Sequence, residues 1–352
     1  MARMGRWFKR EDVFEVTEET GVTAFDLVNQ HLLLVSSTVD VQAVQSLLRD
    51  RLGPCDLAGT GEARLAEGVV LAGPYQLTME DAVDAGVPMP WTVVYSLNAP
   101  VEREDPPRRG ADDRDGFAHA FPDGLPWRDE GQALHLLVAL ARRLRGAVRM
   151  AGSLEVIQPD PDRAVDLHLH SPYWVNPDVL HGVLTRIFPY AHLAIEGQEW
   201  AGPPEAAYDG SAVAEETAFD PLTPAELAQL HSKADKYDIA ALSTDQLDAY
   251  AIIGEVTRGG HDGLVELLVH VAEGTEPVVA DQEWAGKAFI TYEGRWLPPD
   301  PAERERRALS APFVGARERA KPVVTALMRA VVEVTGGVVT DEDGFAVDRY
   351  SL

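Results

Sequence analysis

Cysteine is almost absent from this chain, which has a single one, Cys55, among its 352 residues. One cysteine excludes an intramolecular disulfide and a zinc site built from paired cysteines, and such scarcity is typical of a reducing compartment. Long apolar runs are missing too, since the longest, 133–141, is far too short to span a bilayer. Acidic residues 11 and 12 follow the basic first ten, where a secretion signal would need an apolar stretch. We therefore expect a cytoplasmic protein.

Basic residues are also scarce: 31 lysines and arginines face 57 aspartates and glutamates, so the formal net charge is −26. Phosphate binding needs clustered basic groups, so this balance excludes a general affinity for nucleic acids. It also disfavours docking on an anionic membrane surface. A hydrophobic content of 45% nevertheless suffices for a substantial core.

The common catalytic and nucleotide-binding signatures are absent as well. The chain contains no GxGxxG or GxxxxGK[ST] phosphate loop, no GxSxG nucleophile elbow and no HExxH helix. Its glycine-rich stretch, 258–263, joins two expected strands and therefore predicts a hairpin loop. We accordingly predict no cofactor.

An internal repeat is the most informative positive feature. Residues 39–57 align without a gap on residues 175–193, at an offset of 136, and the matched apolar positions recur at helical spacing. Asp40 and Asn176 occupy the same place, where a short acceptor side chain would cap the first free amides of a helix. We therefore expect equivalent helices at 41–52 and 176–188, each preceded by a strand, at 31–36 and 165–170.

A second gapless match joins the ends of the two halves, residues 133–156 and 324–347, at an offset of 191. Gly146 faces Gly337, and in each segment an apolar helix precedes the glycine and β-branched residues follow it. Glycine readily adopts the left-handed conformation that ends a helix, so we predict a helix, a glycine stop and a tight β-hairpin in both halves.

Together these patterns predict an α+β protein made of two tandem ferredoxin-like units, in which helices cover one face of a mainly antiparallel sheet. The expected order in each unit is β-α-β-β-α-β, with two or more strands between the helices. The first unit should span 1–158 and the second 163–352, with insertions at about 198–245 and 298–312. Prolines and acids at 158–162 mark the boundary.

One candidate metal site lies on an expected strand, where Asp166, His168 and His170 alternate along the chain. A period of two puts all three side chains on one face, and two imidazoles with a carboxylate suit zinc, manganese or iron. The alternative interpretation is a sheet face that points at water. The first half offers no support for a metal, because its matching residues are a glutamine and two leucines.

Candidate partner-binding residues fall into two groups. Trp127 and Trp174 lie in expected loops near the starts of helices, where a tryptophan either anchors a partner or closes the edge of a core. Residues 199–248 hold eleven acids against two lysines, so Glu215, Glu216 and Asp220 are candidates for contact with a basic protein.

These features lead to three hypotheses of different classes. The first is a non-catalytic acidic binding or regulatory protein that sequesters or inhibits a basic protein partner, as an immunity protein does. The second is a metal-dependent enzyme that uses Asp166, His168 and His170. The third is a small-molecule sensor that binds its ligand between the two repeats. Neither nucleic acid nor membrane is an expected partner.

Overall fold

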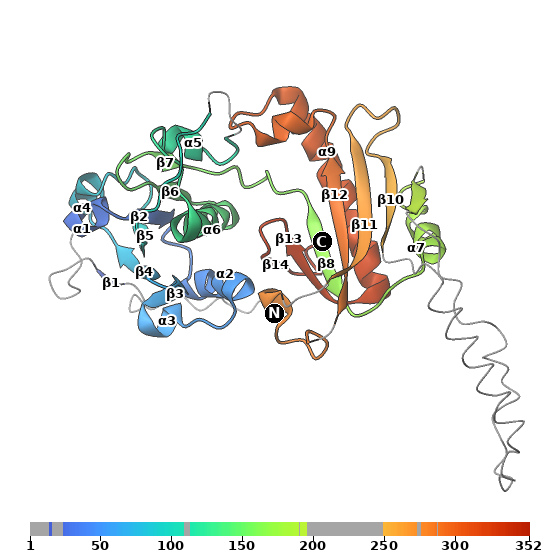
Figure 1. The fold of residues 1–352 in the computed structure, drawn as a ribbon, viewed down its shortest axis with the longest axis horizontal. Helices are drawn as coiled ribbons and strands as arrows, with labels where there is room; N and C mark the ends of the chain where they lie inside the picture. The colour runs from blue at the N-terminus through green and yellow to red at the C-terminus, as the bar shows by residue number, and fades with distance from the viewer. Residues whose placement is uncertain are drawn as a thin grey trace, which may run out of the picture.

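The computed structural model describes residues 14–15, 24–108, 113–189, 191–195, 249–272, 276–286 and 288–352. Within these ranges the chain has a mixed α+β fold, with one sheet in each half of the sequence (Figure 1). All strand pairs are antiparallel except the short pair between β1 and β4. The candidate acids Glu215, Glu216 and Asp220 and the expected insertion at 198–245 lie outside the described residues.

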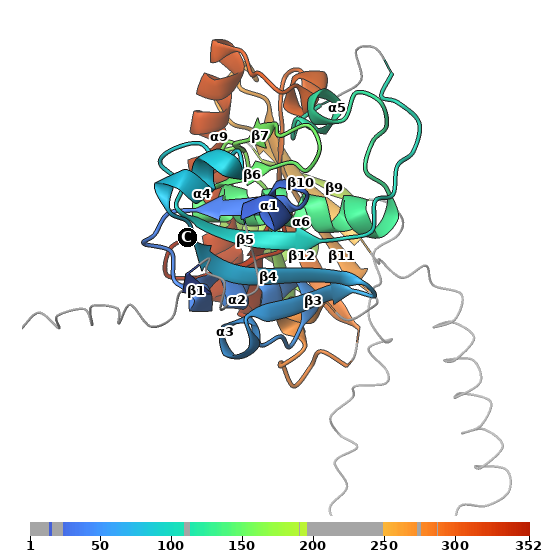
Figure 2. The same ribbon diagram turned by 90° about the vertical axis from the view of Figure 1, so that its left-hand side faces the viewer.

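The first half forms a sheet in the order β1-β4-β5-β2-β6-β7, and β3 also pairs with β4. Helices α1 and α4 cover its outer face, whereas α2 and α6 cover the face turned toward the second half (Figures 1 and 2). The elements are β1 (Phe14–Glu15), α1 (Ala24–Val28), β2 (His31–Val35), α2 (Val41–Leu52), α3 (Leu57–Thr60), β3 (Glu62–Ala66), β4 (Val69–Gln76), α4 (Met79–Asp84), β5 (Val93–Asn98), α5 (Phe117–Ala120), α6 (Arg128–Leu144), β6 (Ala147–Arg149) and β7 (Val156–Ile157).

The second half forms a sheet in the order β14-β13-β8-β12-β11-β10-β9. Helices α7 and α9 bury their apolar residues against one face of it. The elements are β8 (Leu167–Ser171), α7 (Pro177–Leu184), β9 (His192–Ile195), β10 (Ala249–Glu255), β11 (Leu264–Ala272), η3 (Pro277–Val279), β12 (Phe289–Leu297), η4 (Pro301–Glu305), α9 (Ala311–Thr335), β13 (Val338–Asp341) and β14 (Ala346–Val347).

The same pairing sequence occurs in both sheets. Strand β2 lies between β5 and β6, as β8 lies between β12 and β13, and β4 and β11 extend the two sheets in the same direction. The expected helix caps are also present, since Asp40 and Asn176 each accept a hydrogen bond from the amide two residues on, at 2.9 and 3.0 Å. Helix α2 directly follows β2, and α7 directly follows β8.

The strand count differs from the ferredoxin-like order. Three strands, β3, β4 and β5, lie between α2 and α6, whereas a β-α-β-β-α-β unit has two. Strand β5 pairs antiparallel with both β2 and β4, so β4 runs parallel to β2, and the additional strand β3 pairs with β4. The additional strand therefore leaves the order β4-β5-β2-β6 of the sheet uninterrupted.

Neither matched glycine is the cap of its helix, because the preceding residue takes that place: Arg145 after α6 and Gly336 after α9. Arg145, with a φ of 53°, adopts the left-handed conformation after α6, so Gly146 does not end that helix. A Cβ atom at Gly146 would lie 2.3 Å from the carbonyl oxygen of Leu34, and one at Gly337 would lie 2.3 Å from that of His170. Both glycines thus permit the same close approach to the central strand of their sheet.

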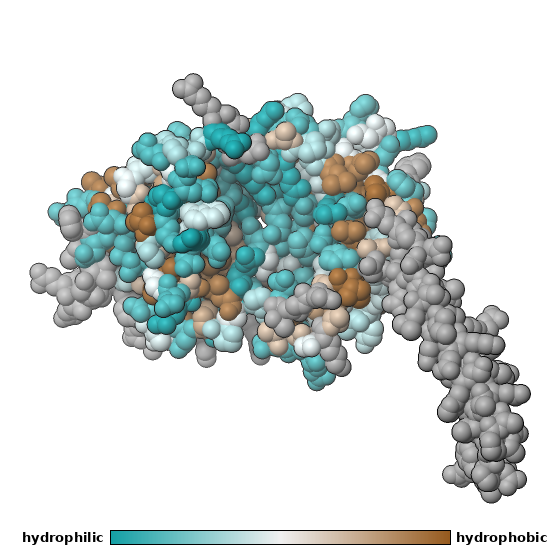
Figure 3. Space-filling model, in the orientation of Figure 1, coloured by the Kyte–Doolittle hydropathy of each residue, from teal (hydrophilic) through white to brown (hydrophobic). Residues whose placement is uncertain are grey.

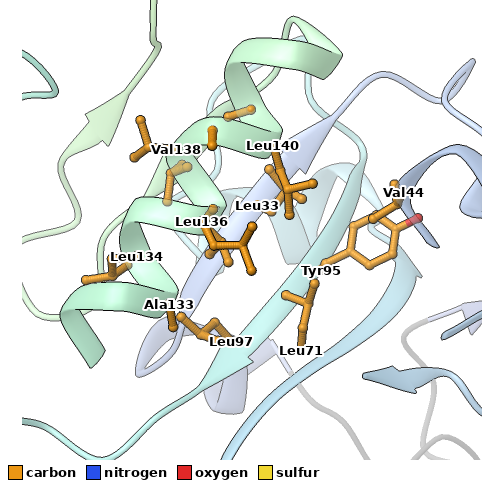
Figure 4. Packing of buried hydrophobic residues seen from close by; sticks show 14 of the residues in the cluster. Leu33, Val44, Leu71, Tyr95, Leu97, Ala133, Leu134, Leu136, Val138 and Leu140 are labelled. Carbon is orange, nitrogen blue, oxygen red and sulfur yellow. The ribbon is translucent and has the colours of Figure 1, made fainter. Parts of the chain in front are cut away.

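Helix α6 supplies much of the first core. Its buried side chains pack on residues of β2, β4, β5 and α2, with Leu33, Tyr95 and Val44 among them (Figure 4). The repeated apolar stripe predicted from the sequence is therefore the stripe that holds the helix on its sheet.

Candidate functional site

The histidines of the candidate metal site lie on β8, opposite Glu293 and Thr291 of β12. Asp166, just before β8, has both carboxylate oxygens occupied. One accepts the Trp296 amide at 2.8 Å, and the other accepts from Arg304 Nη2 at 2.6 Å. The carboxylate therefore holds the end of β12 and a guanidinium.

His170 is buried, with its ring edge-on to Phe289 at a centroid distance of 5.5 Å. Burial, reinforced by the neighbouring His168, lowers the pKa of His170 to about 4, so its imidazole is neutral at pH 7. Among the described residues no group of three or more histidine, cysteine, aspartate or glutamate side chains could hold a metal ion. The assignment of Asp166, His168 and His170 to a metal stays a prediction.

The sheet register adds polar residues that sequence reasoning missed. His270 Nε2 lies 3.1 Å from Glu293 Oε1, and Arg295 Nε donates to Glu266 Oε2 at 3.0 Å. These residues come from β11 and β12, about 100 residues beyond β8 in sequence. Alternation along the two strands was the available signal, but only the register shows that β12 adjoins β8 and that β11 adjoins β12.

The two candidate tryptophans have different surroundings. Trp174 is half-buried and lies edge-on to Tyr250 at a centroid distance of 5.2 Å, so it closes the edge of the second core. Trp127 is 52% exposed at the start of α6. Of the two, Trp127 is therefore the one available to a partner.

The tip of the β13–β14 hairpin, residues 341–345, leaves the second half and docks on the first. Phe345 is fully buried in the core of the first half. Arg51 Nη1 donates to the Asp343 carbonyl at 2.7 Å, and the Ala346 amide donates to Asp50 Oδ2 at 2.9 Å. This hairpin tip joins the two halves through apolar and polar contacts together.

Arg142 is the central cation of the junction. Its Nη1 donates to both carboxylate oxygens of Asp343, at 2.6 and 2.5 Å, and its Nη2 donates to Asp115 at 2.8 Å. The Arg142 side chain is only 5% exposed. Charge-assisted hydrogen bonds of this kind are strong where water is excluded.

Glu342 at the hairpin tip lies between two further guanidinium groups. It pairs with Arg114 and accepts from Arg304 Nη2 at 2.9 Å. Burial alone would raise the pKa of Glu342, but Arg114 and Arg304 hold it below its usual range. The carboxylate is thus kept ionised, and the arginines around it are already paired within the chain.

A buried glutamate anchors the segment that leads from β5 toward α5. Glu130, with no exposed surface, accepts the Glu102 amide at 2.8 Å and pairs with Arg103. The Ala151 amide donates to His31 Nδ1, so His31 Nε2 carries the proton and donates to Glu130 at 3.2 Å. Burial and then Arg103 lower the pKa of His31 to about 4, consistent with this neutral form.

Two cavities meet at the junction of the halves and share Asp115 and His135 in their linings. The first, of about 480 Å³, is the α2/α6 groove, which also touches β3, β4 and the hairpin tip. The second, of about 490 Å³, is the Trp127 cavity, whose rim includes Glu305 of the second half. A third hollow, of about 630 Å³, is lined by the second half and by Asp162 of the boundary segment.

The exterior over the junction is mainly hydrophilic, but hydrophobic surface appears where Figure 1 draws α2, α6 and β3 (Figure 3). The apolar residues that line the α2/α6 groove are Leu52, Leu65, Ala66, Val69, Ala133, Leu136 and Ala139. The groove thus combines an apolar floor with charged ends, a pattern typical of ligand sites.

Comparisons with protein-family models, curated proteins and solved structures find no match for this chain. Within the described ranges, no helix has the length and apolar character needed to cross a membrane.

Proposed function

We propose that this chain is a non-catalytic acidic binding protein that captures a basic protein partner at the junction of its halves. The Trp127 cavity carries this proposal. Glu104, Asp113, Asp115 and Glu305 line it, and its single arginine is already paired with Glu342. A partner would thus meet excess negative charge beside an exposed aromatic anchor.

The charge and the tryptophan would act at different stages of binding. A net charge of −26 attracts a basic surface over a screening length of about 8 Å at physiological ionic strength, and this mainly raises the association rate. Trp127 would then enter the partner and set the lifetime of the complex, as buried aromatic anchors do. The Trp127 amide donates to the Glu102 carbonyl at 3.0 Å, and the Glu102 amide is in turn bound by the buried Glu130.

A site-specific crosslink tests this proposal. A photoreactive phenylalanine at Trp127 should crosslink a partner with a basic surface, whereas the same group at Tyr350, which is 81% exposed, should not. The association rate of the identified pair should then fall between low and moderate salt. Equal crosslinking at both positions, or a rate independent of salt, would refute the proposal.

We also propose that the halves arose by internal duplication of a ferredoxin-like unit, extended among the described strands by one between α2 and α6 and by two between α7 and α9. The shared pairing sequence, the equivalent helix caps and the matched close approaches of Gly146 and Gly337 support this view. In an experimental structure, residues 31–157 and 167–347 should superpose with α2 on α7 and α6 on α9. Unrelated surroundings for these helices would exclude duplication.

The second candidate function is a small-molecule sensor, favoured by the α2/α6 groove at the junction. The metal-dependent enzyme remains an alternative with less support, because Asp166 is bound to Arg304. Elemental analysis of protein purified without chelator, with and without His168→Ala, tests that alternative.

A further inference from the structure

The charges that line the α2/α6 groove do not all compensate one another. Arg142 is shared by Asp115 and Asp343, and Glu342 is held by arginines outside the groove. The carboxylate of Asp129 forms no ion pair with another described residue.

Arg51 is the second uncompensated charge. It donates to the carbonyl oxygen of Asp343 but forms no ion pair with a described carboxylate. The groove therefore offers one anionic and one cationic group to a ligand.

These two groups lie toward opposite ends of the groove. Asp129 is in the first turn of α6, whereas Arg51 meets the hairpin tip beside Arg142, in the last turn. Asp129 and Arg142 are thirteen positions apart on the helix, which at about 1.5 Å per residue places their Cα atoms about 20 Å apart along its axis. A bound ammonium or carboxylate group would lie about 3 Å from the charged group at each end, so the length available to a ligand is on the order of 15 Å.

The surface between the two ends is an apolar stripe. Ala133, Leu136 and Ala139 recur along one side of α6, and residues of α2, β3 and β4 complete the floor. Gln132 and His135 are exposed at the rim, where an amide and an imidazole can hydrogen-bond to peptide groups.

The chain itself shows that this region accepts apolar side chains. Phe345 of the hairpin tip is fully buried among residues of α2, α6 and the first sheet. The Asp343 carbonyl beside it accepts a hydrogen bond from Arg51 Nη1. A ligand in the rest of the groove would bind in a similar way, with side chains on the floor and a polar group at Arg51.

We propose that the α2/α6 groove binds a short apolar peptide with free termini, its ammonium group at Asp129 and its carboxylate at Arg51. This inference rests on the second candidate function and names its ligand class. At about 3.3–3.6 Å per extended residue, the available length fits a peptide of roughly three to five residues. The volume of about 480 Å³ lies within the range of small-ligand sites.

Calorimetry with the full-length protein tests the proposal. The probe is a tetrapeptide of alanine and leucine with free termini, and its N-acetylated and C-amidated forms are the controls. Asp129→Asn should weaken binding of the free peptide about twofold to fivefold, the effect of one partly exposed ion pair. The same variant should leave binding of the acetylated peptide nearly unchanged, because that peptide has no ammonium group to lose.

Arg51 requires a second design, because it also holds the hairpin tip. Arg51→Gln should weaken binding of the free peptide and leave binding of the amidated peptide nearly unchanged. Loosening of the hairpin alone would weaken the binding of both peptides. Ala66→Trp should block the groove and abolish binding of all three peptides. The control Arg306→Gln, at an exposed ion pair elsewhere, should bind like wild type.

Three outcomes would overturn the proposal. They are no binding at millimolar peptide, equal weakening of blocked and free peptides by Asp129→Asn, and binding that survives Ala66→Trp. Equal affinity for a long-chain ω-amino acid of the same length would overturn the assignment to a peptide. Each result is independent of the Trp127 crosslink, so failure of this proposal is distinguishable from failure of the basic-partner proposal.

Discussion

Removing the Phe345 side chain should weaken the first half of the protein, although the residue belongs to the second. Phe345 is fully buried, and it packs in the core formed by α2, α6 and the first sheet. A buried phenylalanine removes about 150–250 Å² from water, worth about 4–6 kcal/mol at 25 cal/mol per Å². Alanine retains the Cβ atom, so we expect Phe345→Ala to lower the free energy of unfolding by about 3–5 kcal/mol.

The location of the effect matters as much as its size. Amide hydrogen exchange should accelerate in α2 and α6, because their shared core would lose a buried ring. Phe313→Ala is the matched control, since Phe313 is buried in the second core. That variant should cost a similar free energy but accelerate exchange in α9 and β12 instead.

Urea denaturation gives the free energies, and exchange measured by mass spectrometry gives the location. A loss below about 1 kcal/mol for Phe345→Ala would mean that the ring is not buried in solution. Faster exchange confined to β13 and β14 would mean that the hairpin does not support the first core. Either result would refute the docking of the hairpin tip.

Three other predictions concern the buried charges. Arg142→Met should cost about 3–5 kcal/mol in urea denaturation because it leaves carboxylates unpaired, whereas Arg306→Met, at an exposed pair, should cost at most about 1 kcal/mol. Burial raises the pKa of Asp341 from 3.8 to about 6, so protonation of this carboxylate stabilises the folded state. As the pH falls from 7.5 to 4, the free energy of unfolding of wild type should rise by up to about 3 kcal/mol relative to that of Asp341→Asn. The absence of such a rise would contradict the prediction. Glu130→Gln should cost about 3–5 kcal/mol by leaving its cationic partner unpaired, while Glu155→Gln at the surface should be nearly neutral by the same measurement.

The local elements could be predicted because their signals lie within short stretches of sequence. The caps at Asp40 and Asn176 and the apolar stripes of α2 and α6 lie next to the structure that they determine. The match between Gly146 and Gly337 was also visible, but the reason for it was not. A close approach to the central strand depends on sheet order, which an isolated helix ending does not contain.

The junction could not be predicted for the same reason. The acidic turn at 341–344 has the composition of a solvent-exposed hairpin, and Arg142 resembles an ordinary cation in the last turn of a helix. About 200 residues separate these partners, and no pattern in either segment points to the other. Phe345, an aromatic residue directly after an acidic turn, was the one local sign that the tip is not simply a surface loop.

The location of the arginines changes the meaning of the acidic composition. Arg114, Arg142 and Arg304 surround the hairpin tip and neutralise its carboxylates, so part of the limited positive charge is used inside the molecule. Buried pairs are screened much less by salt than exposed charges. Moderate salt should therefore weaken the attraction of a basic partner at the Trp127 cavity while the junction that shapes the cavity stays closed. The excess negative charge would guide the basic partner to the Trp127 cavity, and the paired charges of the junction would keep that cavity in shape.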